Sequence, residues 1–188
     1  MTALDLNRPY LDTLSAQADA LGFGDRLAVL QADMSAPPVC AEGYDLIWSE
    51  GAIYVIGVET GLRAWRPLLE PGGRQALTEL SWLNDRPSKG ARDFGTAAYP
   101  AMETVAGNCH RLDAAGFDLG TSFALPPEDW TADYYDPLRA SIAAFRTRHA
   151  ADPIALAIAD NSAREIEVFD QNPGAYSYAF YIARKRLE

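Results

Sequence analysis

Cysteine, histidine and long apolar runs are scarce in this sequence, and each scarcity excludes a class of protein. The two cysteines, Cys40 and Cys109, lie far apart without metal-ligand spacing, so we expect unpaired thiols in a reducing compartment. The two histidines, His110 and His149, have no cluster of cysteines or acids around them, so the sequence predicts no metal site. No stretch approaches the roughly 20 apolar residues of a membrane span, and the first residues do not resemble a signal peptide. The expected location is the cytoplasm.

Basic residues are also few compared with acidic ones. The chain has 16 Lys and Arg residues against 26 Asp and Glu residues, a net charge of -10. A basic surface large enough for nucleic acid or an anionic membrane is therefore not expected. With 188 residues, 48% of them hydrophobic and 22% charged, the chain is long enough to bury a sizeable core. We therefore expect one globular domain spanning residues 1–188.

Residues 44–48 are the strand around which we expect the domain to be organised. Their nearly continuous apolar and aromatic character is typical of a strand that is buried on both faces. Ser49, Glu50 and Gly51 follow as a polar exit. In an open parallel sheet the binding crevice lies beyond the carboxyl ends of the strands. Ser49 and Glu50 are therefore the first candidates for chemistry.

Strand and helix patterns alternate along the first two thirds of the chain. We expect further strands at residues 3–6, 27–31, 75–80 and 117–125. Apolar residues at helical spacing predict helices at residues 10–21, with Asn7 as N-cap, at 57–69 and at 102–115. The polar stretch 84–101, which contains glycines and prolines, is expected to be a mobile loop or lid. This alternation indicates an α/β fold with a mostly parallel sheet and helices on its faces.

Residues 126–172 show a different pattern. Two long helical patterns are separated by Ala151, Asp152 and Pro153, and strand patterns resume only after residue 172. We expect a helical insertion that could cover the crevice. The closing segment, residues 176–184, alternates Tyr and Ala and is expected to be an antiparallel strand at or near an edge of the sheet.

Four motifs in order resemble the class I S-adenosylmethionine-dependent methyltransferases of the small-molecule type. Ala-Leu-Asp-Leu-Asn matches the end of the family's second strand, and Leu-Gln-Ala-Asp-Met the end of its third. Tyr-Asp-Leu-Ile-Trp-Ser-Glu-Gly matches the fourth strand, and Trp-Arg-Pro-Leu-Leu-Glu-Pro-Gly-Gly-Arg the approach to the fifth. The resemblance implies a doubly wound, Rossmann-like, mostly parallel sheet with an antiparallel last strand and a helical insertion before it.

The resemblance implies S-adenosylmethionine as cofactor and assigns residues to it. Asp5, beside Leu6, would hold the ribose hydroxyls, and Asp33 would approach the adenine amino group beside Met34. Ser49 would border the methionine part. A carboxylate can accept two hydrogen bonds from vicinal hydroxyls, which agrees with this assignment. Two simpler explanations stay open, because an acid such as Asp5 also favours a following helix N-terminus and Asp33 is an ordinary turn residue.

Candidate catalytic and substrate-binding residues follow the fourth and fifth strands. We take Glu50 and Tyr54 as catalytic candidates, with Trp48 and Ile53 completing the pocket wall. A general acid or base at Glu50 would need an apolar surround that raises its pKa, although methyl transfer depends mainly on positioning. Glu50 could also be a helix cap or a surface charge, and Trp82 could be a packing residue. The candidates for binding a small-molecule methyl acceptor are Glu79, Trp82, Tyr99 and Tyr134.

One departure from the family pattern concerns the first strand and its Gly-rich turn. These should precede Asp5, but the sequence begins at Met1 and contains no Gly-x-Gly-x-Gly run. In the family that strand lies between the second and the fourth, so its absence would leave a central gap with unpaired backbone groups. Three explanations stay open: an incomplete copy of a longer enzyme, completion of the sheet by a second chain as in a homodimer, or a rearranged domain without activity.

The expected function is methyl transfer to a small molecule, with activity impaired if the Gly-rich motif is missing. The alternative is a non-catalytic, methyltransferase-derived domain that dimerises or binds a partner. A nicotinamide dehydrogenase is disfavoured, because the chain lacks the Gly-rich fingerprint and a Tyr-x-x-x-Lys pair.

Overall fold

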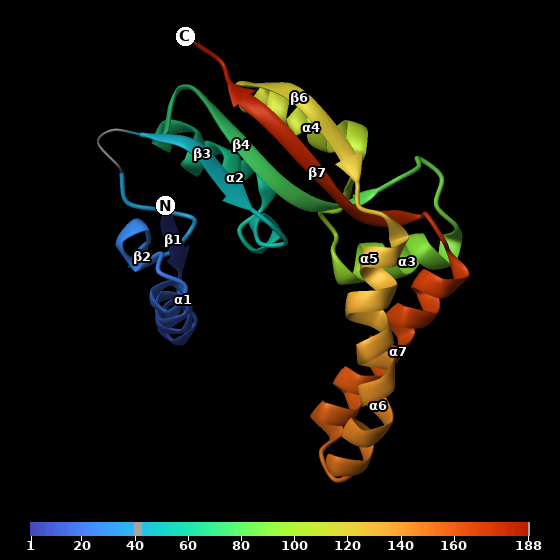
Figure 1. Ribbon diagram of the computed structural model, residues 1–188. Coiled ribbons are helices and arrows are strands. Elements are labelled where there is room, and N and C mark those ends of the chain that lie inside the picture. The colour runs from blue at the N-terminus through green and yellow to red at the C-terminus, as the bar shows by residue number, and fades with distance from the viewer. Residues whose placement is uncertain (40–42, 188) are drawn as a thin grey trace.

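A computed structural model describes residues 1–39 and 43–187, so the prediction for Cys40 lies outside the described residues. The strands form a parallel pair and, beside it, a larger sheet (Figure 1). The pair consists of β1 (Thr2–Asp5) and β2 (Ala28–Gln31). The larger sheet has the order β3 (Tyr44–Ser49), β4 (Leu69–Trp82), β7 (Tyr176–Lys185) and β6 (Phe117–Ala124), and the short β5 (Glu103–Thr104) pairs with β4.

Strand directions agree with the fold expected from the sequence. β1 is parallel to β2, and β3 and β5 are parallel to β4. β7 is antiparallel to both β4 and β6, and it lies next to the edge strand β6. The predicted α/β architecture, mostly parallel with an antiparallel last strand, is therefore confirmed.

Helix α1 (Arg8–Ala20) connects β1 to β2, as the sequence predicts. Asp5 lies opposite Gln31 in the parallel register. The predicted cap is different in detail: Asn7 occupies the N-cap position, but its side chain does not cap the helix. Its backbone N–H instead donates a 2.7 Å hydrogen bond to Asp5 Oδ1. A 3-10 turn, Gly24–Arg26, leads into β2.

The prediction that residues 44–48 are buried on both faces is wrong. The Trp48 side chain is 59% exposed and the Leu46 side chain 45% exposed. The physical reason is the position of β3, which pairs with β4 on one side and has no second strand partner within residues 1–39 and 43–187. A central strand and an edge strand of this kind have the same sequence pattern.

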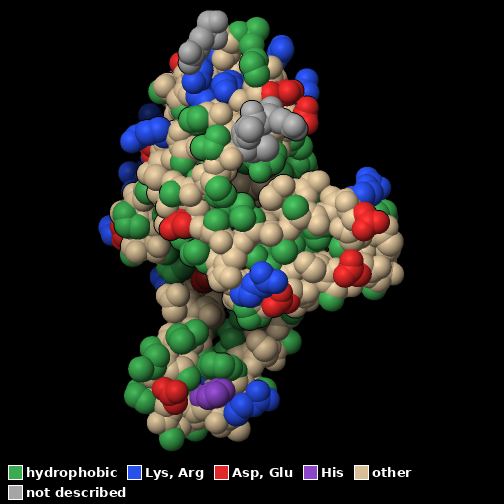
Figure 2. Space-filling model, turned by 90° about the vertical axis from the view of Figure 1, so that its left-hand side faces the viewer, with side chains coloured by type: hydrophobic (Ala, Val, Ile, Leu, Met, Phe, Trp, Pro, Cys, Tyr) green, Lys and Arg blue, Asp and Glu red, His purple; other side chains and the backbone are tan. Residues whose placement is uncertain are grey.

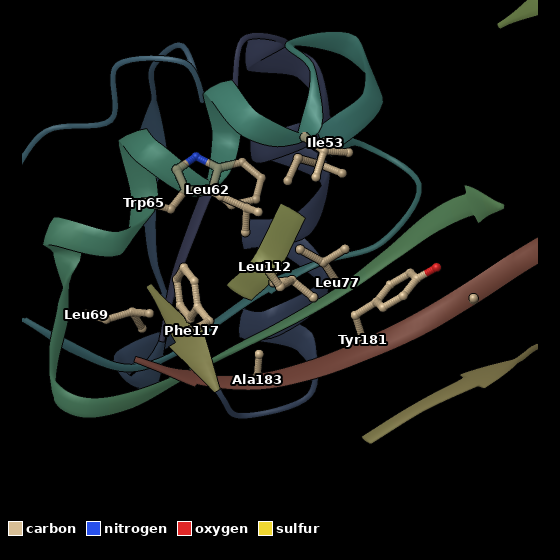
Figure 3. Close-up of a cluster of buried hydrophobic side chains, with 11 residues drawn as sticks. Ile53, Leu62, Trp65, Leu69, Leu77, Leu112, Phe117, Tyr181 and Ala183 are labelled. Carbon is tan, nitrogen blue, oxygen red and sulfur yellow. The ribbon is translucent and has the colours of Figure 1, made fainter. Parts of the chain in front are cut away.

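The main core lies on one face of the larger sheet, under α2 (Val58–Trp65) and α4 (Val105–Ala114). Short 3-10 turns precede and follow α2, at Ile53–Val55 and Arg66–Leu68. Figure 3 shows the α2 side chains directed toward those of the sheet and α4. The buried residues include Ile53, Leu62, Trp65, Leu69, Leu77, Leu112, Phe117 and Tyr181. Cys109, a free thiol, is partly buried against this core.

The prediction of a mobile loop at residues 84–101 is wrong for most of that stretch, which contains helix α3 (Lys89–Ala98). The Ser88 side chain caps the helix by accepting a 3.1 Å hydrogen bond from the backbone N–H of Ala91. Gly95 faces the Trp82 ring, because a Cβ on Gly95 would lie 2.6 Å from Trp82 Cη2. A cap and a close contact thus stabilise a helix in a glycine-containing segment.

Residues 126–172 form helices that project away from the sheet (Figure 1). They consist of α5 (Pro127–Trp130), a π-helical turn (Thr131–Tyr135), α6 (Asp136–Arg148) and α7 (Pro153–Gln171). A second buried cluster joins these helices to the sheet and includes Tyr135, Ile142, Ile166, Phe169 and Tyr176. Among the helices in the described ranges, none is long and apolar enough to cross a membrane.

Candidate functional site

The predicted cofactor residues lie around the carboxyl ends of β1, β2 and β3. Asp5 is the last residue of β1, Asp33 follows β2, and Ser49 ends β3. Because β1 and β2 are parallel and adjacent, Asp5 and Asp33 lie at the same end of this strand pair, where both strands have their carboxyl ends. The structure therefore brings together the two acids that the sequence analysis singled out.

Both acids are held by turns of their own. Asp5 Oδ1 accepts a 2.7 Å hydrogen bond from the N–H of Asn7, and Asp33 Oδ1 accepts one of 2.7 Å from the N–H of Ser35. The backbone and side chain of Ser35 hold the pKa of Asp33 below its usual value. Each turn occupies one oxygen and fixes the orientation of the other. Both carboxylates are thus hydrogen-bond acceptors held in a fixed orientation at the carboxyl ends of β1 and β2.

Met34 connects the β1–β2 pair to the rest of the molecule. Its carbonyl oxygen accepts a 2.7 Å hydrogen bond from Trp65 Nε1 of α2, and its side chain packs against the main core. Leu6, the other predicted apolar neighbour, is exposed. The loop after β2 is therefore fixed to α2 and the main core, whereas the carbonyl oxygen of Leu6 accepts a 3.1 Å hydrogen bond from Gln31 Nε2 of β2.

A groove of about 850 Å³ lies between β1 and β3. Met34, Ser49 and Glu50 line it, so it joins one side of the predicted cofactor region to the end of β3. Asp5, Leu6 and Asp33 do not line the groove: Asp5 ends β1, and Leu6 and Asp33 follow β1 and β2. Figure 2 shows hydrophobic side chains around a hollow on this side of the molecule.

The surroundings of Glu50 differ from the predicted pocket. Glu50 is exposed, and its Oε1 accepts a hydrogen bond from Trp48 Nε1. Ile53, expected in the pocket wall, is fully buried in the main core. Tyr54 is exposed, and its ring meets that of Tyr99 edge to face at 6.0 Å. Glu50 is therefore an exposed carboxylate beside Trp48 and is not enclosed by apolar side chains as expected.

Glu79 has that enclosure. Its side chain is 1% exposed, and neither carboxylate oxygen has a hydrogen-bond partner in the part of the chain that the structure describes. Burial raises the pKa of Glu79 to about 7, against the opposing effects of the Tyr99 hydroxyl and the Arg111 guanidinium. Burial and the neighbouring Glu79 also raise the pKa of Tyr99. The sequence placed Glu79 at a strand end but gave no signal for its burial, which depends on Tyr99.

An aromatic stack connects the helical insertion to the sheet. The Trp130 ring lies parallel to that of Tyr178, with centroids 5.3 Å apart at 6°, and Trp130 Nε1 donates a 2.9 Å hydrogen bond to Ser177 Oγ. Tyr134 is exposed and meets Trp130 edge to face at 6.1 Å. The Tyr178 hydroxyl lies 3.6 Å from where a Cβ on Gly51 would be. The sequence analysis missed Tyr178, although its alternation with Tyr176 marked that face.

Trp82 has a position that packing explains. Its ring meets that of Tyr176 edge to face at 6.0 Å and is covered by α3 at Gly95. Contact between Trp82 and a substrate therefore stays a prediction. Among residues 1–39 and 43–187, no group of three or more His, Cys, Asp or Glu side chains could hold a metal ion.

Comparisons with known proteins place this geometry in a known fold. No protein-family model matches the sequence, and no curated protein matches it. YjhP from E. coli is similar in structure, with a TM-score of 0.76 at 17% identity over 99% of this chain and 76% of that one. A SAM-dependent methyltransferase from Thiobacillus denitrificans, solved with S-adenosyl-L-homocysteine, gives 0.74 at 19% identity over 98% of this chain and 75% of that one.

The [4+2]-cyclase SpnF has the same TM-score as the Thiobacillus denitrificans enzyme, 0.74, at 15% identity over 100% of this chain. This chain spans 66% of the length of SpnF. Identities this low show the fold and leave the reaction open, because one fold can carry different chemistries. The chain has the Rossmann-like α/β fold of the class I S-adenosylmethionine-dependent methyltransferases.

Proposed function

We propose that this protein transfers a methyl group from S-adenosylmethionine to a small molecule. The observation that carries the proposal is the pair Asp5 and Asp33, two oriented carboxylates that follow adjacent parallel strands. The free oxygen of one suits the vicinal hydroxyls of a ribose, and that of the other suits the amino group of an adenine. Because the two acids stand at the carboxyl ends of adjacent parallel strands, we assign them to the two ends of one nucleoside.

The surrounding residues fit the remainder of such a cofactor. Met34, fixed by Trp65, offers an apolar surface beside Asp33, and Ser49 lies at the end of the groove where the methionine part would extend. S-adenosylmethionine supplies a methyl group that is already strongly electrophilic on its sulfonium. The main task of the protein is therefore to hold the acceptor atom in line with that methyl group.

The acceptor would lie between β3 and the insertion. Tyr54 and Tyr134 present exposed aromatic surfaces there, and Tyr99 stands behind Tyr54. We assign Glu50 and Tyr54 to the catalytic side of this space. Glu79, Tyr99 and Tyr134, together with Trp82 as support for α3, form the acceptor side. The buried Glu79 would accept a hydrogen bond from a polar group of the acceptor once Tyr99 moves aside.

A second candidate function is a non-catalytic domain that binds a partner. One observation favours it: within residues 1–39 and 43–187, β1 and β3 each leave one edge without a strand partner beside the groove. Binding of the cofactor separates the two candidates.

Isothermal titration of the chain with S-adenosyl-L-homocysteine tests the proposed function. We expect binding, and a loss of about tenfold or more in affinity for each of Asp5→Asn and Asp33→Asn, since each removes a charge-assisted hydrogen bond. Asp25→Asn, at an exposed acid of the turn before β2, is the matched control and should bind as the parent does. Equal binding by all variants, or no binding of S-adenosylmethionine and S-adenosylhomocysteine by the parent, would contradict the proposal.

A further inference from the structure

Glu79 of β4 is a buried acid without a hydrogen-bond partner. Among residues 1–39 and 43–187, the buried side chains with unpaired polar atoms are Gln75, Glu79, Tyr99 and Tyr176, so Glu79 is the only acid of this set. Both of its carboxylate oxygens are unpaired, although the residue is only 1% exposed. Burying a polar group without a hydrogen bond destabilises a fold. A carboxylate in this environment is stabilised by a cation or a hydrogen-bond donor from outside the chain.

Arg111 of α4 influences Glu79 but is engaged elsewhere. Burial raises the pKa of Glu79, Arg111 opposes this effect, and Glu59 adds to it. Arg111 Nε forms a 2.7 Å ion pair with Glu59 Oε1 of α2, and Arg111 Nη1 donates a 3.1 Å hydrogen bond to Asn108 Oδ1. Glu59 thus balances the charge of Arg111. The charge of ionised Glu79 is not balanced by an ion pair of its own.

Tyr99 lies beside both Glu79 and the exposed Tyr54. Burial and the neighbouring Glu79 raise the pKa of Tyr99, and its ring meets that of Tyr54 edge to face at 6.0 Å. Tyr99 directly follows α3, and its hydroxyl has no hydrogen-bond partner within the described ranges. Rotation of the Tyr99 side chain therefore breaks no hydrogen bond of that hydroxyl. Rotations of this kind are common when a ligand binds, and here one would open a path from Tyr54 to Glu79.

A third tyrosine ring stands beside this path. The hydroxyl of Tyr178 lies 3.6 Å from where a Cβ on Gly51 would be, just after β3. Burial raises the pKa of Tyr178, and the neighbouring Tyr54 and Glu79 raise it further. The rings of Tyr54, Tyr99 and Tyr178 thus gather near one buried carboxylate. Aromatic rings attract organic cations through their faces, and a carboxylate balances the charge of such a cation.

We propose that the methyl acceptor carries an organic ammonium group, which Glu79 binds by its charge and the rings of Tyr54, Tyr99 and Tyr178 enclose. This assignment rests on the proposed function, since it concerns the acceptor of the same site. An anionic group is disfavoured there, because it would meet Glu79 and Glu59 while Arg111 is already paired. The ammonium group fixes how the acceptor is held, whichever of its atoms receives the methyl group.

Choline and its uncharged isostere, in which carbon replaces the quaternary nitrogen, test the role of charge. The two molecules have the same shape, and the nitrogen of choline has no lone pair that could accept a further methyl group. NMR titration of the backbone amides measures binding to the chain without cofactor. We expect choline to shift the amides of Gly51 and Tyr99 and to bind about tenfold or more tightly than the isostere. Equal affinity of the two molecules, or no binding of choline, would overturn the assignment.

Glu79→Gln keeps the size of the side chain and removes its charge. We expect this variant to lose about tenfold or more in affinity for choline, while its affinity for the isostere is unchanged. Glu128→Gln, at an exposed acid of α5, is the matched control and should bind choline as the parent does. A Glu79→Gln variant that binds choline as tightly as the parent would contradict the role of Glu79.

The pH dependence of choline binding to the parent needs no variant. A proton on Glu79, whose pKa is about 7, competes with the cation, so the affinity should rise about tenfold from pH 6 to pH 8. Choline does not titrate, and neutral amides, phenols, guanidinium groups and ordinary carboxylates do not titrate in this range either. The charged and titratable groups around Glu79 are of these kinds, namely Glu59, Tyr99, Arg111, Tyr178 and Tyr181. An affinity that does not change with pH would overturn the assignment.

Failure of the cation site is distinguishable from failure of the proposed function. A chain that binds S-adenosyl-L-homocysteine but not choline would contradict the cation site and leave methyl transfer standing. A chain that binds choline through Glu79 but not S-adenosyl-L-homocysteine would support the cation site and contradict methyl transfer.

Discussion

Trp65 of α2 donates a 2.7 Å hydrogen bond from Nε1 to the carbonyl oxygen of Met34, which follows β2. This bond links the loop after β2 to α2, which packs on the larger sheet. The β1–β2 pair and the larger sheet share no strand pairing within the described residues. The Trp65 ring is buried in the main core, and Met34 packs against the same core. The loop that carries Asp33 is thereby fixed to the larger sheet through its neighbour.

Replacing this donor tests how the two sheets are connected. We expect Trp65→Phe to lower the free energy of unfolding by about 1 to 3 kcal/mol, from the lost hydrogen bond and the smaller ring. We also expect faster amide exchange in β1 and β2 than in β4. Urea unfolding and exchange measurements check both effects. Trp48→Phe is the matched control, because Trp48 is 59% exposed and should change stability by less than about 0.5 kcal/mol. Uniform loss of protection in all strands would contradict a connecting role.

The buried Glu79 predicts a pH dependence of stability. Its pKa is raised to about 7 in the folded protein and has its ordinary value of 4.5 in the unfolded chain. The folded state therefore binds the proton more tightly. The resulting stabilisation is complete below about pH 4.5 and is lost as the pH rises to about 7, by up to about 3 kcal/mol.

Glu79→Gln removes this contribution, because a neutral amide takes the place of the titrating acid. We expect the free energy of unfolding of the variant, measured in urea, to rise relative to that of the parent between pH 5 and pH 8. Glu128→Gln, at an exposed acid of α5, should keep the pH dependence of the parent. If Glu79→Gln also keeps it, Glu79 does not titrate as its burial implies.

Local patterns predicted most strands and the positions of Asp5 and Asp33, because an acid that follows a buried strand lies at the sheet edge whatever the rest of the fold does. They could not predict that β3 is half exposed. The apolar run from Tyr44 to Trp48 is the same whether or not a neighbouring strand is present, and only the pairing shows which edge is free.

The candidate site shows the same division between local and distant causes. Glu50 and Glu79 both stand near strand ends, but only Glu79 is enclosed, since Tyr99 approaches it from 20 residues further along the chain. Helix α3 was missed for a similar reason. Its glycines lower the helix propensity of the segment, whereas Ser88 and Trp82 stabilise it through a cap and a tertiary contact.

The stack of Trp130 on Tyr178 predicts how the insertion is held. Trp130→Ala removes the ring contacts and the hydrogen bond to Ser177, and we expect a loss of about 2 to 4 kcal/mol in the free energy of unfolding. Limited proteolysis should then cut α6 and α7 before the sheet. Tyr134→Ala, at the exposed neighbour, should cost less than about 1 kcal/mol. Equal effects of the two substitutions would show that the stack does not anchor the insertion.

Two glycines of α3 provide a matched test of that helix. A Cβ on Gly90 would meet only Ser88 Oγ at 3.9 Å, so Gly90→Ala should raise the free energy of unfolding by about 0.5 to 1 kcal/mol through helix propensity. A Cβ on Gly95 would lie 2.6 Å from the Trp82 ring, so Gly95→Ala should lower it by about 1 to 3 kcal/mol despite the same gain in propensity. Urea unfolding of both variants gives the signs. In a mobile loop the two substitutions would have small and equal effects, so opposite signs establish both the helix and its contact with Trp82.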